Sequence, residues 1–520
     1  MLSLFADEPQ PRDLSLPDAA IAAAGRPRRA GGVRDVFEST VDARMLEVYD
    51  RAADPADPFE LRDLWLGRVE HQLGQHGGRP WLAEKWTSST VRRSTTAQEV
   101  LSSRATVRFV KELFNWYFRD DLYGELRPTA KHILSGGAVD EEAWGLPAAL
   151  KQCVSFALGR DWYGYSDSRG RWPARAAVAE YENNRINGAK YAPENVALTM
   201  GGTLAVSALS DFILHGRPAG GSPALCAVPN YPPLVEAVAR RGEVRLVPLP
   251  SANGVTSLEP LIAALRPDTP MVMMQTAGNP TGALVREEEL SRLITAAGPN
   301  TTILLDECHE WLGPVTPASP ERAAAKVVRV SSLSKNWSAP GLKVGWMLAD
   351  ERFVAEYYEY ASTSFGGPPS FFYTLVEVLA RMERWVITDV VELDAAHLAE
   401  FESTYGVTLG GLQAAYSSYR QERMARDRGL TLLRDATTAR FSELPALVLP
   451  PRFSVNMAVD FPEWDDSYLC FRDMLRETGV SMLPGILTFC MSGAVMRVTS
   501  AQKWANLEAA MTGIGERVAR

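Results

Sequence analysis

The sequence predicts an α/β protein whose large domain contains a mostly parallel, seven-stranded sheet. Three observations predict this fold class: short β-rich runs alternate with helical stretches, the runs are apolar throughout, and polar residues directly follow several of them. Continuously apolar strands are typical of a sheet covered on both faces, and helical crossovers join parallel strands. The seven expected strands are 196–200, 224–228, 244–247, 271–274, 302–305, 327–330 and 344–348.

The chain of 520 residues is long enough for more than one domain. Residues 1–35 are rich in Pro, Ala, Arg and Gly and are expected to form a flexible leader. A helical N-terminal extension is expected over 36–130, followed by the large domain over 131–360. A smaller C-terminal α/β domain is expected over 361–520, with a polar insertion near 388–412.

Two helices are expected within the N-terminal extension, at 59–73 and near 97–121. Apolar residues recur there at the three- and four-residue spacing of one helix face. In the second helix these residues are Val107, Val110, Phe114 and Tyr117. We therefore expect this part of the chain to form a helical layer.

Composition excludes several classes of protein. The formal net charge is -9 and the basic residues form no long tract, which argues against a nucleic-acid partner. The 5 cysteines are far apart and form no Cys-x-x-Cys pair, so neither a disulfide framework nor a metal site is expected. No apolar run approaches the about 18 residues of a transmembrane helix. These features predict a cytoplasmic protein without a membrane partner.

Polar residues follow the expected strands at the points where the strands end. Ligands bind at the carboxyl ends of the strands in open α/β sheets, so these residues are candidates for one site. The chain order of the candidates is Gly202 and Thr203 after the first strand, Tyr231 after the second, Asn279 after the fourth, Asp306 at the end of the fifth and Lys335 beyond the sixth. The two residues after the first strand also open a helix, whose N–H groups favour a phosphate.

This set of groups matches the needs of pyridoxal 5'-phosphate. A carboxylate against the pyridine nitrogen keeps it protonated, so that the ring withdraws electrons from the substrate α-carbon. A lysine amine that burial makes less basic attacks the cofactor aldehyde and later carries the α-proton. Each residue alone has an ordinary alternative, such as a helix cap for Asp306 or a surface ion pair for an arginine. The ordered set argues against those alternatives.

The motifs Asn279-Pro-Thr-Gly282, Asp306-Glu307 and Ser332-Leu-Ser-Lys335, the last followed by Pro340-Gly341, resemble those of the class I/II, fold type I aminotransferases. The resemblance covers roughly residues 130–515. It implies a fold type I enzyme that transfers the amino group of an α-amino acid through a Lys335 Schiff base and a quinonoid intermediate. The chain is also similar to 1-aminocyclopropane-1-carboxylate synthases and to aspartate 4-decarboxylases.

The resemblance implies roles for five residues around the cofactor ring. Lys335 would form the internal aldimine, and Asp306 would pair with the pyridinium nitrogen. Asn279 would bond the ring 3-oxygen, and Tyr231 would stack on the ring. His309 stands where the family usually has a tyrosine that also bonds the 3-oxygen. An imidazole donates the same bond or carries a proton, and a conservative polar exchange is the alternative.

The resemblance assigns other residues to the cofactor phosphate. Gly202, Thr203 and Ser332 would hold it, and Lys343 stands where the family normally places an arginine. Lysine keeps the charge but loses the planar fork of a guanidinium. Tyr165, in a tyrosine-rich loop, would reach the phosphate in the neighbouring subunit, which implies a homodimer with shared sites.

Arg497 and Gly137 are implied to contact the substrate. The arginine would grip the α-carboxylate through a bidentate pair, and the glycine would line the substrate pocket. Because His309 and Lys343 depart from the family pattern, a second reaction class stays open. The alternative is a lyase or a carbon–carbon bond-forming enzyme that acts by β- or γ-elimination or replacement, for example on S-adenosylmethionine. A catalytically silent relative is the third possibility.

Overall fold

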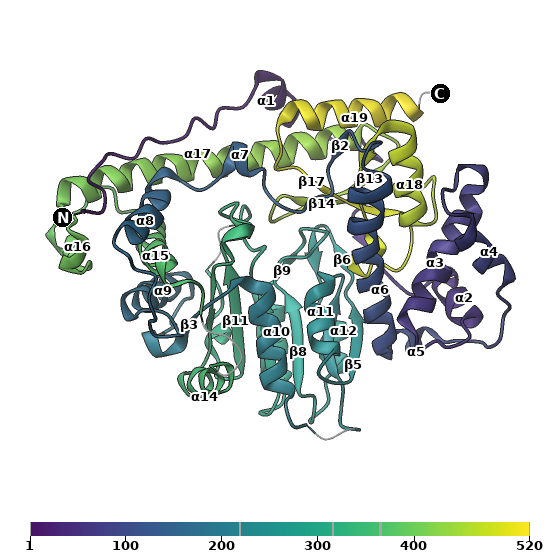
Figure 1. Cartoon of the computed structure of the whole chain (residues 1–520), viewed down its shortest axis with the longest axis horizontal. Coiled ribbons are helices and arrows are strands. Elements are labelled where there is room, and N and C mark those ends of the chain that lie inside the picture. Colours follow the sequence, from purple (N-terminus) through teal and green to yellow (C-terminus); the bar gives the residue numbers. More distant parts are fainter. Residues whose placement is uncertain (1, 218–219, 315–316, 363–366, 519–520) are drawn as a thin grey trace.

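The computed structural model of the chain (Figure 1) describes residues 2–217, 220–314, 317–362 and 367–518. Residues 1, 218–219, 315–316, 363–366 and 519–520 lie outside it, so the expected leader and domains are described in part. Within the described ranges, no helix is both long and apolar enough to cross a membrane.

A seven-stranded sheet forms the centre of the molecule, in the order β3-β12-β11-β10-β8-β4-β5 (Figure 1). Its strands are β3 (Val196–Thr199), β4 (Ala224–Val228), β5 (Val244–Pro248), β8 (Met271–Gln275), β10 (Thr302–Asp306), β11 (Val327–Ser332) and β12 (Gly345–Leu348). Only β12 runs antiparallel to its neighbours; the other described pairings are parallel. The expected mostly parallel sheet is confirmed, and each strand begins and ends within two residues of its expected bounds.

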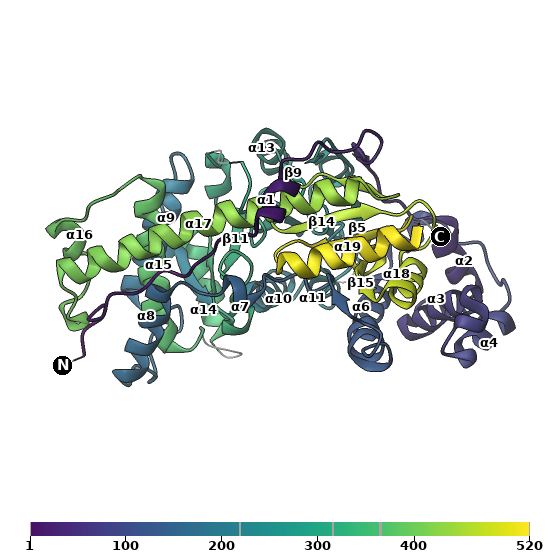
Figure 2. The ribbon, with the colours of Figure 1, turned by 90° about the horizontal axis from the view of Figure 1, so that it is seen from above.

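Helices cover both faces of this sheet, which explains why its strands are apolar throughout. Every residue of β4 and β8 is buried. The helices α10 (Gly201–Leu214) and α11 (Pro232–Ala239) lie on the face turned to the viewer in Figure 1, and α13 (Glu287–Ala296) lies on the opposite side (Figure 2). The sheet is therefore the middle layer of an α/β sandwich.

A second, antiparallel sheet lies towards the C-terminus, in the order β13-β14-β17-β16. Its strands are β13 (Leu447–Leu449), β14 (Asn456–Asp460), β16 (Leu483–Pro484) and β17 (Val495–Thr499). The helices α18 (Ser467–Thr478) and α19 (Trp504–Val518) belong to this region, and α17 (Leu409–Ser442) runs from it across the top of the molecule (Figures 1 and 2). The smaller C-terminal α/β unit is therefore present.

The N-terminal extension is helical, as expected, but its second helix is broken. Its helices are α2 (Ala43–Arg51), α3 (Pro58–Leu73), α4 (Pro80–Ser88), α5 (Ala97–Ser102) and α6 (Arg104–Trp116), and α6 continues as the π-helix η2 (Tyr117–Glu125). The break falls at Ser103, because its side chain accepts from the N–H of Ala105 and caps α6. Thr96 begins α5 in the same way, through a capping box with Glu99.

The segment before residue 36 packs against the protein, although the sequence predicts a flexible leader. Its helix α1 (Asp18–Ala24) lies against α17, and the purple trace of the N-terminus follows α17 in both ribbon views. Leu4 and Phe5 are buried, and the N–H of Leu4 donates to the carbonyl of Tyr405 at 2.9 Å. The segment is ordered because these apolar side chains find a hydrophobic cluster, which composition alone does not reveal.

The remaining elements lie outside these two sheets. The other α-helices are α7 (Glu141–Trp144), α8 (Ala148–Gly159), α9 (Trp172–Arg185), α12 (Glu259–Ala264), α14 (Glu351–Ala361), α15 (Tyr373–Ile387) and α16 (Ala395–Ala399). The short strands are β1 (Val36–Phe37), β2 (His132–Ile133), β6 (Ser251–Ala252), β7 (Val255–Thr256), β9 (Leu284–Val285) and β15 (Val480–Ser481).

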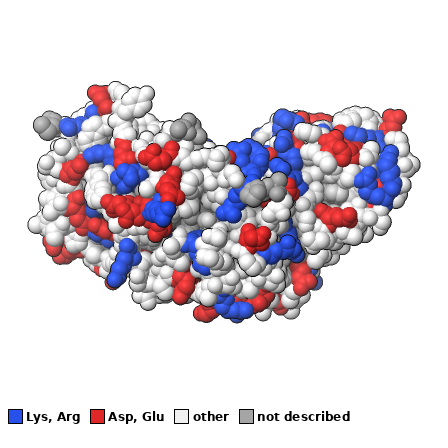
Figure 3. Space-filling view, turned by 90° about the horizontal axis from the view of Figure 1, so that it is seen from below, with Lys and Arg blue, Asp and Glu red and all other residues white. Residues whose placement is uncertain are grey.

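Seen from below, the outline is hollowed between the left and right lobes, and acidic and basic side chains are interspersed (Figure 3).

Candidate active site

A cavity of about 370 Å³ opens at the carboxyl edge of the central sheet, between this sheet, β17 and the end of α6. All but one of the predicted site residues line it. They are Gly137, Gly202, Thr203, Tyr231, Asn279, Asp306, His309, Ser332, Lys335, Lys343 and Arg497. The exception is Tyr165, which is exposed outside this cavity. Residues separated by up to 360 positions thus meet at one edge of the sheet.

Lys335 lies just beyond the end of β11 and extends into the cavity. Its Nζ donates to the carbonyl oxygen of Gly137 at 2.5 Å. Burial, followed by the nearby guanidinium of Arg497, lowers the pKa of the Lys335 amine from 10.5 to about 8. A substantial fraction of this amine is therefore unprotonated just above neutral pH, as attack on a carbonyl requires.

Asp306 ends β10 and presents a buried carboxylate to the same cavity. Its Oδ2 accepts from Nε2 of Gln275 at 2.8 Å, and its Oδ1 accepts from the N–H of Cys308 at 3.1 Å. It is 5% exposed, and no described side chain forms an ion pair with it. A buried carboxylate is costly without a cation, so this position suits a protonated ring nitrogen.

Glu307, the next residue, points to the other face of the sheet edge because side chains alternate along a strand. Its carboxylate accepts from Nη1 of Arg322 and from Nη2 of Arg329, each at 2.7 Å. Burial opposes ionisation, but the two guanidinium groups outweigh it and hold the pKa of the Glu307 carboxyl well below its usual range. These ion pairs fix the chain that carries Asp306.

One end of the cavity has the features of a phosphate site. Helix α10 begins there, and its N-cap, Met200, makes no side-chain hydrogen bond to the first turn. A Cβ on Gly202 would lie 2.8 Å from Sγ of Cys308, so glycine keeps this turn open. Thr203, Ser332 and Lys343 line the same cavity. Unfilled N–H groups, hydroxyls and an ammonium group together suit a phosphate.

Arg497 enters the cavity from β17, the central strand beside β14. Its Nη1 donates to Oδ1 of Asn279 at 3.3 Å and its Nη2 to the carbonyl of Ser135 at 2.8 Å. Its Nε is buried and has no hydrogen-bond partner among the described residues. Burial lowers the pKa of Arg497 to about 10, so the guanidinium stays charged at neutral pH. The group suits a carboxylate.

Gly137 lies against this arginine. Its φ is +64°, and a Cβ at this position would be 2.5 Å from Nη2 of Arg497. Its N–H donates to Oγ1 of Thr499 at 2.9 Å, while its carbonyl accepts from Lys335. Only glycine combines this left-handed conformation with so close an approach.

His309 is buried, and its Nδ1 is 3.0 Å from Oγ of Ser454. Burial, followed by the charges of Lys335 and Arg497, lowers the pKa of His309 well below 6.5. The imidazole is therefore neutral at neutral pH and forms a hydrogen bond without adding positive charge to the site.

Sequence reasoning missed several cavity residues. Gln275 and Cys308 contact Asp306. Both lie at or just after the end of a strand, and this position could have identified them as candidates for the site. Phe114 and Phe118 also line the cavity. The helical spacing around Phe114 predicted a packing face, and periodicity does not reveal what a face packs against.

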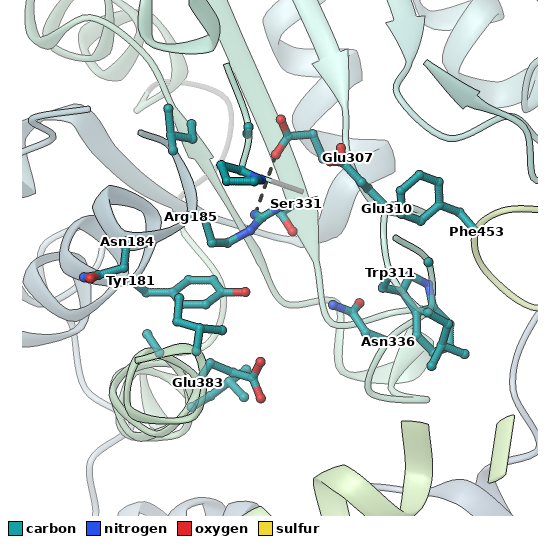
Figure 4. Close-up of a pocket in the computed structure, with 18 of the residues that line it drawn as sticks. Tyr181, Asn184, Arg185, Glu307, Glu310, Trp311, Ser331, Asn336, Glu383 and Phe453 are labelled. Carbon is teal, nitrogen blue, oxygen red and sulfur yellow. Dashed lines mark ion pairs between the residues drawn. The ribbon is translucent and has the colours of Figure 1, made fainter. Parts of the chain in front are cut away.

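A larger cavity of about 770 Å³ is lined by none of the predicted residues (Figure 4). Several of its charged side chains form ion pairs: Arg185 lies 3.9 Å from Glu307 (Figure 4), and Glu383 accepts from Nε of Arg423 at 2.9 Å. Among the described residues, no group of three or more His, Cys, Asp or Glu side chains is placed to hold a metal ion. We therefore assign the chemistry to the smaller cavity.

Residues 134–393, half of the chain, match the profile of the family described as aminotransferase class I and II. The chain belongs to this family. Among relatives, a probable N-succinyldiaminopimelate aminotransferase of Mycobacterium tuberculosis is 28% identical over 268 residues, which are 48% of this chain and 64% of the relative. A cystine lyase of Arabidopsis thaliana is 27% identical over 234 residues, which are 44% of this chain and 54% of the relative.

The match to these two relatives thus spans less than two thirds of their length. Among solved structures, N-succinyldiaminopimelate aminotransferase from Mycobacterium tuberculosis superposes with a TM-score of 0.60 at 22% identity, over 77% of this chain and 97% of that one. This aminotransferase-family chain therefore has the fold type I architecture that the sequence predicts. The two secondary similarities stay predictions.

Proposed function

We propose that the protein is a pyridoxal 5'-phosphate-dependent aminotransferase that acts on an α-amino acid in the smaller cavity. One observation carries this proposal. The same cavity holds a buried carboxylate without an ion-pair partner among the described residues, Asp306, and a lysine amine with a pKa lowered to about 8, Lys335. A cofactor with a basic ring nitrogen and an aldehyde satisfies both groups.

The residues present fit this cofactor. Asp306 would hold the protonated ring nitrogen, Asn279 and His309 would bond the ring 3-oxygen, and Tyr231 would cover one ring face. The cofactor, when bound, supplies an electron sink that stabilises negative charge at the substrate α-carbon. Lys335 would hold the cofactor aldehyde covalently.

The phosphate would lie at the first turn of α10, held by Gly202, Thr203 and Ser332. Lys343 would contribute a point charge there in place of a planar guanidinium. Its φ of +56° turns the chain just after the Pro-Gly turn, beside the first turn of α10, where Gly201 lies. Because an ammonium group binds phosphate with less directionality than a guanidinium, we expect Lys343 to accept a wider range of phosphate positions than an arginine would.

The substrate would be oriented by Arg497, whose guanidinium binds the α-carboxylate, while Gly137 leaves room beside it. With the substrate bound, the amine of Lys335 would be placed to move the proton at the substrate α-carbon. Its hydrogen bond to the carbonyl of Gly137 places the amine beside the carboxylate site. The neutral His309 keeps its hydrogen bond throughout, since its charge does not change near neutral pH.

We further propose a homodimer in the cytoplasm, with the domain bounds expected from the sequence. The exposure of Tyr165 outside its own cavity supports a role in the partner's site. All five cysteines are free, which supports a reducing compartment. Mixed dimers test the shared sites. Lys335→Ala and Tyr165→Ala subunits, each inactive or impaired alone, should regain activity when co-assembled, because one site then contains both native residues. Unchanged inactivity of the mixture would refute the shared site.

An elimination or replacement lyase is the second candidate. Two observations favour it: a relative is named a cystine lyase, and His309 places a neutral imidazole beside Lys335 and Arg497. A neutral imidazole accepts a proton more readily than a phenol does. It is therefore suited to a second proton transfer during loss of a β- or γ-substituent.

Incubation of the purified holoenzyme with single amino acids separates the two candidates. Transamination converts the bound cofactor to its amine form and releases a keto acid, which absorbance and mass spectrometry detect. Elimination returns the cofactor to its starting spectrum and releases a fragment of the substrate. Lys335→Ala is the control, since it should abolish both reactions. An unchanged covalent cofactor in this variant would overturn the assignment of the lysine.

A further inference from the structure

An aromatic wall closes the side of the cavity that the N-terminal extension covers. Phe114 and Phe118, one turn apart on α6 and η2, both line the cavity. Their ring centroids are 4.9 Å apart in an edge-on arrangement, and Phe114 meets the edge of Tyr231 at 5.8 Å. The wall thus begins at the residue proposed to cover the cofactor and continues outward, where the ring of Tyr123 stacks on Phe118 at 6.0 Å.

Two buried hydrogen bonds fix the helix that carries this wall. The hydroxyl of Tyr117 lies 2.9 Å from Oγ of Ser481, and the carboxylate of Asp121 accepts from the hydroxyl of Tyr468 at 2.7 Å. Both anchors join the π-helix to the C-terminal unit. Single π-turns within helices frequently occur at functional sites because they redirect side chains. Here the two anchors hold the phenylalanine pair towards the cavity.

Within one subunit, the charged residues that line the cavity leave no partner for a charged substrate side chain. Of the described residues that line it, only Asp306, Lys335, Lys343 and Arg497 carry charge at neutral pH, since His309 is neutral. Each of the four already has a task in the proposed function: ring nitrogen, aldehyde, phosphate and α-carboxylate. A charged side chain placed against the aromatic wall would lose its hydration without gaining an ion pair from this subunit.

We propose that Phe114 and Phe118 receive the substrate side chain and that the preferred substrates are α-amino acids with aromatic side chains. This inference rests on the proposed function. A planar ring held edge-on by two phenylalanines gains both apolar burial and a favourable quadrupole contact. A small side chain such as that of alanine leaves the wall uncovered and gains neither. The wall belongs to a helical segment that precedes the residues matched by the family profile.

The first experiment compares kcat/KM for L-phenylalanine, L-alanine and L-aspartate. The wild-type enzyme should prefer L-phenylalanine. Phe118→Ala and Phe114→Ala should lower kcat/KM for L-phenylalanine by between about tenfold and about 200-fold, the range for lost apolar contacts in a pocket, and should lower the value for L-alanine by a clearly smaller factor. Phe118→Leu, which keeps the apolar volume, should recover part of the loss. Trp81→Ala is the matched control, since this exposed aromatic residue contacts Trp116 outside the cavity.

A second experiment measures binding without turnover. Calorimetric titration of the holoenzyme should give a dissociation constant at least about tenfold lower for 3-phenylpropanoate than for propanoate, and Phe118→Ala should remove this difference. Binding can be measured even if the enzyme transaminates no amino acid. Absence of transamination would refute the proposed function but not the inference about the side-chain pocket. The inference itself is overturned if L-aspartate is preferred, if both variants lower kcat/KM equally for L-phenylalanine and L-alanine, or if the two carboxylates bind equally well.

Discussion

The reactivity of Lys335 gives a quantitative test of the site. Burial and the guanidinium of Arg497 lower the pKa of its amine from 10.5 to about 8. At pH 7, about one amine in ten is then unprotonated, against about three in 10,000 for an unperturbed lysine, a difference of about 300-fold in reactive amine. Because only the unprotonated form attacks the aldehyde, capture of the cofactor should accelerate as the pH rises and level off above about 8.

The assay is the rate at which apoenzyme takes up pyridoxal 5'-phosphate, followed by absorbance between pH 6 and pH 10. Arg497→Gln removes a neighbouring positive charge, which raises the pKa of Lys335 and moves the midpoint of the pH profile upward. Arg352→Gln, at an arginine whose side chain is 88% exposed, is the matched control and should leave the midpoint unchanged. A wild-type midpoint near 10.5, or the same midpoint in Arg497→Gln, would refute the reasoning.

Three further predictions concern other parts of the site. Gly137→Ala places a Cβ 2.5 Å from Nη2 of Arg497 and imposes a strained φ. KM for the amino acid should therefore rise at least about tenfold while the fold persists. An unchanged KM would contradict the close approach. His309 has a pKa well below 6.5 and is unprotonated above that pH, so the pH profile of kcat should lack an inflection near 6.5; an inflection there that disappears in His309→Tyr would show a charged imidazole. Glu307→Ala leaves the buried guanidinium of Arg329 without this partner and should destabilise the protein by about 3 to 5 kcal/mol. Thermal unfolding should then occur at a lower temperature than in the wild type. An unchanged unfolding temperature would show that the ion pairs do not fix the sheet edge.

Much of the site could be predicted because strand ends converge. Asp306 and Lys335 follow adjacent strands, and Asn279 follows the strand on the other side of β10, so a parallel sheet brings them to one edge. Arg497 belongs to a different sheet, and only the family motif placed it in the cavity. Their proposed roles await the experiments above.

Other features depended on contacts between segments that are distant in sequence. Ser454 approaches His309 across 145 positions, and no local pattern marks it as a site residue. The leader composition suggested flexibility, yet Leu4 and Phe5 are buried in the region of Tyr405. Two apolar residues in a stretch rich in Pro and Gly are too few to predict from sequence that the segment packs against the protein.

The sequence by itself determined the layered α/β fold, the strand positions and the set of polar groups at the strand ends. Each of these follows from local periodicity or from the common edge of a parallel sheet. Tertiary structure alone decided that Phe114 and Phe118 form a wall of the cavity and that Glu307 is held by two arginines. Hydrophobic spacing predicts that a side chain is buried, but the surface against which it is buried is set by the packing of distant elements.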